Sequence, residues 1–160
     1  EPREMADRMV EAEGRACIAV IAVMSDDDVD TVIRSNVVMV GSDGIPLGEE
    51  AHPRLRLTFP RVRGHYVRGR RSVAVPSAVH RMTGLSAERF GLADRGVIRP
   101  GAFADLVLFD PDTIADTGTY TEPNSVPDGI SGVWVNGTRV VDGGEITGAR
   151  PGSVLRHERA

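Results

Sequence analysis

The chain has 160 residues, of which 41% are hydrophobic, a length sufficient for one domain with a core or for parts of two. Its net charge of −4 and pI of about 5.6 argue against a nucleic-acid-binding surface. No apolar run approaches the roughly 20 residues of a membrane-spanning helix, and no signal peptide is visible. We therefore expect neither a nucleic-acid partner nor a membrane partner.

The composition also excludes some chemistry. All 19 basic residues are Arg, so a Schiff-base lysine, a lysine nucleophile and a carboxylated-lysine metal bridge are excluded within this sequence. Cys17 is the single cysteine, which excludes an internal disulfide and is compatible with a reducing, cytoplasmic location. Cys17 itself lies in an apolar run and is expected to act as a small hydrophobic residue.

The first half alternates predicted helices with predicted strands. Residues 1–13 have helical spacing, with Met5 and Met9 expected in a core, and the apolar run 16–24 predicts a buried strand. Ser25 and the acids after it predict the start of a short helix that ends near Arg34. The run Val37–Val40 predicts a second strand. This order is typical of parallel β/α units.

The second predicted strand leads into the most informative stretch of the sequence. Gly41-Ser42-Asp43-Gly44 follows it, and glycines beside an acid allow a sharp turn that presents the carboxylate at the strand tip. Ser-Asp-Gly is also a common turn sequence without catalytic meaning. Residues 45–63 are predicted to form a loop, within which Arg54 could bind a carboxylate through two parallel hydrogen bonds.

The second half predicts a different architecture. Residues 64–71 and 72–91 are expected to form helical pieces, and residues 96–101 a short strand and turn. Strands are predicted at 104–110 and on both sides of Asn136-Gly137, which is a strong signal for a type I′ hairpin, whereas residues 113–128 read as a polar loop. We therefore divide the chain into residues 1–94 and an antiparallel β module with a C-terminal tail at 95–160.

Several of these blocks resemble the metal-dependent amidohydrolase superfamily. The segments RGVIRPGAFADLVLFD (95–110) and VWVNGTRVV (133–141) are similar to the small β domain that follows its catalytic barrel. A narrower resemblance, to the N-acyl-D-amino-acid deacylases or D-aminoacylases, rests on seven further blocks. These are VGSDG (40–44), HPR (52–54), TFPR (58–61), GHY (64–66), MTGL (82–85), ERFG (88–91) and TGARPG (147–152).

The resemblance implies a fold and a chemistry. It implies that 16–24 and 37–40 are the last two strands of a (β/α)₈ barrel, so the fold class would be α/β with a small antiparallel β module after it. Asp43 matches the family's catalytic aspartate, which takes a proton from a zinc-bound water, passes it to the leaving amine and can contact the second metal position. Arg54 matches the arginine that pairs with the α-carboxylate of the D-amino acid.

The sequence also departs from that pattern. Arg56-Leu57 stands where the family often has an aromatic residue and Gly, and the His-X-His pair that holds zinc is absent. The four histidines, His52, His65, His80 and His157, have no ligand spacing. Because a complete barrel needs about 250 residues and the chain opens on Glu1-Pro2, we expect a C-terminal portion whose main zinc ligands lie upstream.

The expected function is therefore zinc-dependent hydrolysis of N-acyl-D-amino acids by an intact enzyme, with the isolated portion inactive. Two alternatives remain open, a non-catalytic β-module or assembly protein and an amidohydrolase of different specificity that acts on cyclic amides. Unpaired barrel strands expose apolar edges, so we also expect a homo-oligomer or association with the missing N-terminal part.

Overall fold

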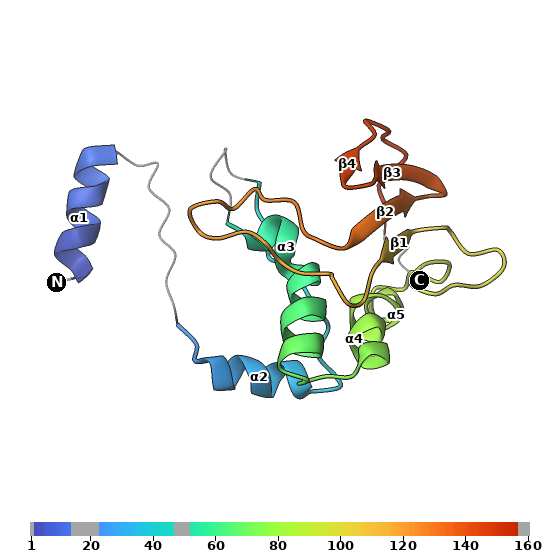
Figure 1. The fold of residues 1–160 in the computed structure, drawn as a ribbon, viewed down its shortest axis with the longest axis horizontal. Helices are drawn as coiled ribbons and strands as arrows, with labels where there is room; N and C mark the ends of the chain where they lie inside the picture. Colours follow the sequence, from blue (N-terminus) through green and yellow to red (C-terminus); the bar gives the residue numbers. More distant parts are fainter. Residues whose placement is uncertain (1, 14–22, 47–51, 157–160) are drawn as a thin grey trace.

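The computed structural model describes residues 2–13, 23–46 and 52–156, and its elements are helices followed by a four-stranded sheet (Figure 1). The helices, with α denoting α-helices and η2 a π-helix, are α1 (Pro2–Glu13), α2 (Asp26–Arg34), α3 (Arg54–Arg61), η2 (Val62–Gly69), α4 (Val75–Met82) and α5 (Gly84–Arg89). The strands are β1 (Leu106–Phe109), β2 (Ile130–Val135), β3 (Thr138–Asp142) and β4 (Glu145–Ile146). The sheet is antiparallel throughout, in the order β1-β2-β3-β4.

Local signals in the sequence correctly predicted several elements. Ser25 caps α2 through a reciprocal capping box with Asp28, whose backbone N–H lies 3.1 Å from the Ser25 Oγ. Asn136 and Gly137 have φ values of 48° and 79° and form the turn between β2 and β3, as their type I′ sequence predicts. Helix α1 is also confirmed, but Met5 is 65% exposed and Met9 44% exposed, so the expectation that both methionines pack in a core is wrong.

The predicted loop at 45–63 is wrong from Arg54 onward, because α3 begins there and continues directly into η2. Pro60 lies inside α3, where it removes a backbone donor, and the helix widens into π geometry from Val62 onward. The predicted helix at 64–71 exists as part of η2, of which Arg63, Gly64 and Val67 are buried. Helices α3 and η2 contribute Leu57, Val62 and Val67 to the core.

Two predicted strands are not formed. Residues 37–46 contain no helix or strand, because a strand needs a neighbour to receive its backbone hydrogen bonds and no neighbouring strand lies along this segment in the described residues. Residues 96–101 form bends and turns instead of a strand. Most of the predicted strand at 16–24, including Cys17, lies outside the described residues.

Arg81 of α4 holds the 37–40 segment in place. The Arg81 side chain is only 2% exposed, and its Nε donates to the carbonyl oxygen of Val38 at 2.7 Å. Its Nη1 donates to the carbonyl oxygen of Ile33 at the end of α2, while the Val40 N–H donates to the Arg81 carbonyl at 3.2 Å. Burial lowers the pKa of Arg81. One guanidinium therefore replaces part of the pairing that a neighbouring strand would supply.

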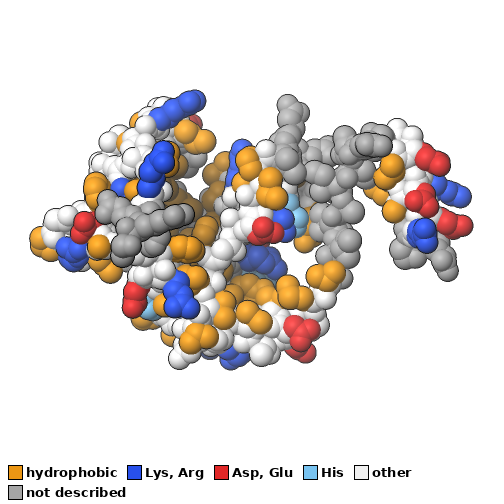
Figure 2. All heavy atoms as spheres, turned by 180° about the vertical axis from the view of Figure 1, so that it is seen from behind, with side chains coloured by type: hydrophobic (Ala, Val, Ile, Leu, Met, Phe, Trp, Pro, Cys, Tyr) orange, Lys and Arg blue, Asp and Glu red, His pale blue; other side chains and the backbone are white. Residues whose placement is uncertain are grey.

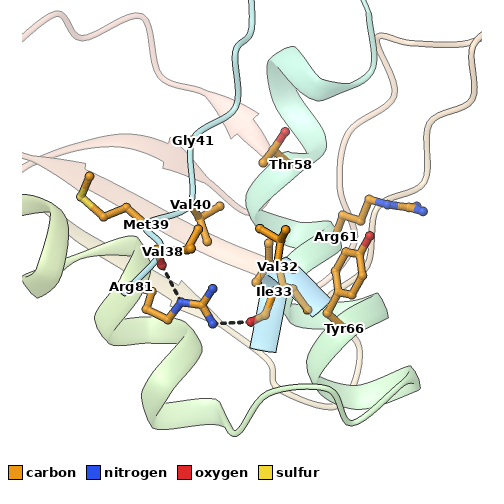
Figure 3. A pocket seen from close by; sticks show the side chains of 11 residues that line it. Val32, Ile33, Val38, Met39, Val40, Gly41, Thr58, Arg61, Tyr66 and Arg81 are labelled. Carbon is orange, nitrogen blue, oxygen red and sulfur yellow. Dashed lines mark hydrogen bonds between the residues drawn. The ribbon is translucent and has the colours of Figure 1, made fainter. Parts of the chain in front are cut away.

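These residues line a pocket of about 240 Å³ between α2, the 38–41 segment, α3, η2 and α4 (Figure 3). The Arg81 side chain reaches between Val38 and Ile33 at its base, with Val40 and Val32 above it. The pocket is lined mainly by hydrophobic side chains. Hydrophobic side chains also gather around a central hollow on the face seen in Figure 2.

The polar segment 111–128 packs closely on α3 and η2, so it is more than a solvated loop. Its Ile114 is buried, and a Cβ added at Gly118 would lie 2.4 Å from Leu57 Cδ1 of α3. Asp116 forms an ion pair with Arg61 at 2.7 Å. Figure 1 shows this segment running beside α3 before it enters β2. The helices and the sheet are thus connected along this segment.

A second connection fixes the hairpin turn. The Asn136 N–H donates to Asp105 Oδ1 at 2.8 Å, and Arg95 donates to Asn136 Oδ1 at 2.7 Å and forms an ion pair with Asp105. Burial opposes ionisation of Asp105, but the Asn136 N–H and Arg95 together lower the pKa of its carboxyl group. Asn136 also donates to the Pro151 carbonyl at 2.7 Å, so the turn anchors the C-terminal tail.

We predict that Arg81→Met in the intact protein lowers the free energy of unfolding by about 2–4 kcal/mol, because it leaves two partly buried carbonyl groups without their charged donor. Urea denaturation measures this change. The control Arg89→Met removes an exposed arginine of neighbouring α5 and is expected to have little effect. Equal stability of the two variants would contradict the role given to Arg81.

Candidate functional site

The structure brings together the two residues that the sequence singled out. Arg54 Nη2 lies 3.0 Å from Asp43 Oδ2, with 40% of the Arg54 side chain and 78% of the Asp43 side chain exposed. The pair therefore faces solvent and is accessible to a small molecule. The sequence placed both residues near one strand end, and the structure places them in direct contact.

Asp43 lies in a tight turn. Its φ of 48° is in the left-handed region, which Asp tolerates better than most residues. The next N–H, that of Gly44, donates to Ser42 Oγ at 3.2 Å. A Cβ at Gly44 would lie only 2.8 Å from the Leu55 Cα, so glycine allows this turn to lie against the start of α3. The close approach is what brings Asp43 within reach of Arg54.

Arg54 is the first residue of α3, and its guanidinium has a buried donor without a partner among the described residues. The Nε of Arg54 is buried and has no hydrogen-bond partner among the described residues, whereas Nη2 of the same side chain contacts Asp43. Nε and Nη2 form one edge of the guanidinium plane, and a carboxylate can accept from both at once. Nη2 is taken by Asp43 and Nε is closed to solvent, so a carboxylate could bind this edge in bidentate fashion only if Asp43 and the groups that cover Nε moved aside.

His52 is a further polar residue at this site. Its Nδ1 accepts a hydrogen bond from the Arg54 backbone N–H at 3.0 Å, and its ring packs edge-on against Tyr120 of the 111–128 segment. Burial lowers the pKa of His52, the Arg54 guanidinium lowers it further, and Asp43 opposes this shift. A neutral imidazole is required for Nδ1 to accept, which agrees with the direction of the shift.

The HPR motif included His52 without a role, and no motif included Tyr120. The signal for His52 was its position two residues before Arg54, since a histidine there can accept from the start of the helix. Tyr120 lies 66 positions beyond Arg54 in the numbering (120 − 54), and nothing local in the sequence indicates their proximity. His80 is exposed, as expected, and His157 lies outside the described residues.

The described residues do not form a metal site by themselves. They contain no group of three or more His, Cys, Asp or Glu side chains arranged to hold a metal ion. Asp43 is a single carboxylate already paired with Arg54, so contact between Asp43 and a second metal remains a prediction. In the same part of the chain, no helix combines the length and apolar character of a membrane span.

The family and its members were identified by comparison. The pattern of the Amidohydrolase family matches residues 3–141. A D-aminoacylase from Alcaligenes xylosoxydans xylosoxydans is 46% identical over 142 residues, which is 89% of this chain and 29% of that protein. An N-acyl-D-aspartate deacylase and an N-acyl-D-glutamate deacylase from the same organism are 46% and 41% identical, over 86% and 93% of this chain and 28% and 31% of theirs.

Solved structures give the same result. A D-aminoacylase described as defining a novel subset of amidohydrolases superposes with a TM-score of 0.76 at 47% identity, over 79% of this chain and 27% of that one. An N-acyl-D-glutamate deacylase from Bordetella bronchiseptica, complexed with zinc and a phosphonate mimic of the tetrahedral intermediate, gives a TM-score of 0.71 at 50% identity, over 73% and 25%.

The chain spans less than a third of the length of these curated relatives. The resemblance seen in the sequence is confirmed, since the mixed α/β fold described here aligns with part of the D-aminoacylase structure. This chain belongs to the amidohydrolase family and is a homologue of one portion of the N-acyl-D-amino-acid deacylases.

Proposed function

We propose that an intact protein containing this chain hydrolyses N-acyl-D-amino acids to a carboxylic acid and a D-amino acid. The three curated relatives are named as a D-aminoacylase and two N-acyl-D-amino-acid deacylases, and each matches 86–93% of the chain at 41–46% identity. This chain would be the C-terminal portion of that enzyme and would be inactive in isolation. Zinc, present in the related N-acyl-D-glutamate deacylase structure, is the proposed cofactor.

The observation that carries the proposal is the guanidinium edge of Arg54. Its Nη2 already binds a carboxylate, that of Asp43, and its Nε donor is buried and unsatisfied within the described residues. Once Asp43 and the groups that cover Nε move aside, the α-carboxylate of an N-acyl-amino acid could accept from both nitrogens in the bidentate geometry that arginine favours. An amide lacking that carboxylate would leave the Nε donor unpaired.

Asp43 is the proposed proton carrier. When the substrate carboxylate takes the Arg54 edge, the Asp43 carboxylate is released toward the acyl group beside it. Hydrolysis requires the attacking water to lose a proton and the leaving amine to gain one, and a single carboxylate can accept the first and donate the second. The exposed position of Asp43 leaves it accessible to both. Since the described residues form no metal site, zinc would be held by ligands elsewhere in the intact enzyme.

The exposed apolar surface supports the view that further protein covers this chain. Hydrophobic side chains that elsewhere would be buried are exposed on α1, α2 and the segments around them, among them Val23, Met24, Val32 and Val37. Exposed apolar surface of this extent is typical of an interface. We infer that the remainder of the intact protein, or a second copy, packs on this surface.

We predict that Arg54→Ala lowers kcat/KM for an N-acetyl-D-amino acid by about 10²–10³-fold, the loss expected for charge-assisted hydrogen bonds to a carboxylate. The matched substrate is the corresponding N-acetyl-D-amino acid amide, which has no carboxylate and should lose little. Steady-state kinetics on both substrates distinguishes a loss of carboxylate binding from a folding defect of the variant. Equal losses on the two substrates would indicate a folding defect and argue against carboxylate binding by Arg54.

For Asp43→Ala in the intact enzyme, we predict a fall in kcat of at least about 10²–10⁴-fold, because the proton carrier is lost. Zinc content, measured by mass spectrometry of the purified protein, should stay largely unchanged. Asp27→Ala on α2 removes an exposed acid away from the site and serves as the control. Near-normal turnover of the Asp43 variant would remove this assignment.

A further inference from the structure

Tyr120 contacts the candidate site from the 111–128 segment. Its ring centroid lies 5.2 Å from that of His52, with the two ring planes at 86°, an edge-to-face arrangement. Tyr120 is nevertheless 68% exposed, so its contribution to a hydrophobic core is small. A large aromatic side chain that is mostly exposed but holds a specific ring contact points to a role at the site.

His52 lies between Tyr120 and Arg54 and contacts both. Its ring meets Tyr120 while its Nδ1 accepts from the Arg54 backbone N–H at 3.0 Å. These two contacts fix the plane of the imidazole and, with it, the position of the N-terminal residue of α3. The first turn of α3 is also held by Thr58, whose hydroxyl donates to the Arg54 carbonyl at 2.8 Å. The backbone of Arg54 is therefore restrained on both sides.

The segment that carries Tyr120 is attached to the same helix. Arg61 at the end of α3 pairs with Asp116, and Arg56 Nη1 donates to the Asn124 carbonyl at 3.4 Å. Between these two contacts, Gly118 lies directly against Leu57. The segment therefore follows α3 along its length (Figure 1). The contact with His52 places Tyr120 at the end of the helix where Arg54 lies.

We propose that Tyr120 is a positioning residue, which acts through His52 to align the Arg54 guanidinium for the carboxylate of the substrate. The inference rests on the proposed function and extends it to a segment that the motifs do not include. Removal of the ring frees the imidazole to rotate, and the Arg54 backbone then loses a fixed acceptor. We therefore expect weaker binding of the substrate carboxylate and an unchanged rate of the chemical step.

The test uses the intact zinc enzyme with an N-acetyl-D-amino acid and its amide. Tyr120→Ala should raise KM for the acid about three- to tenfold, the range expected for one aromatic pair, with kcat changed less than about twofold. KM for the amide should not change. Tyr120→Phe retains the ring and should behave as the unmodified enzyme. Val126→Ala removes an exposed side chain of the same segment and is the matched control.

Three results would overturn the inference: an unchanged KM in Tyr120→Ala, equal effects on the acid and the amide, or a Tyr120→Phe variant as impaired as Tyr120→Ala. The Arg54→Ala variant, measured in parallel, distinguishes failure of the role given to Tyr120 from failure of the proposed function. If Arg54→Ala discriminates acid from amide and Tyr120→Ala does not, only the role of Tyr120 is rejected. If neither discriminates, carboxylate binding by Arg54 is rejected together with it.

Discussion

The ion pair between Asp43 and Arg54 is the interaction around which the candidate site is built. It joins a turn that follows an apolar segment to the first residue of a helix, two parts of the chain that must approach closely for the contact to form. Gly44 permits that approach because a side chain there would meet the backbone of Leu55. An exposed ion pair contributes little to stability, so its effect here is geometric: it holds the Arg54 guanidinium against the turn that carries Asp43.

The elements predicted correctly are those whose signals are local. The capping box of Ser25 and Asp28 and the Asn136-Gly137 turn need only a few neighbouring residues, and both are present as expected. Helix α3 was missed because Pro60 is a signal for helix termination, and the switch to π geometry after it has no sequence signature. The segment at 37–40 was expected as a strand, but pairing is a non-local property, and Arg81 now holds its backbone.

The candidate site also combines residues with local sequence signals and residues without them. Asp43 and Arg54 were identified from motif and position, whereas Tyr120 and Arg81 were not, because burial and ring contacts between distant segments leave no local pattern. Residues 113–128 were predicted to be a polar loop, yet the buried Ile114 and the ion pair of Asp116 to Arg61 attach them to α3. A polar composition therefore did not distinguish a free loop from one that shapes a site.

The most direct measurement is a crystal structure of the intact protein with a phosphonate mimic of an N-acyl-D-amino acid bound. We predict the ligand carboxylate at about 2.7–2.9 Å from Arg54 Nε and Nη2, with the Asp43 carboxylate displaced from Arg54 and directed at the phosphonate. A ligand carboxylate bound by other residues, with the Asp43–Arg54 ion pair intact, would contradict the account.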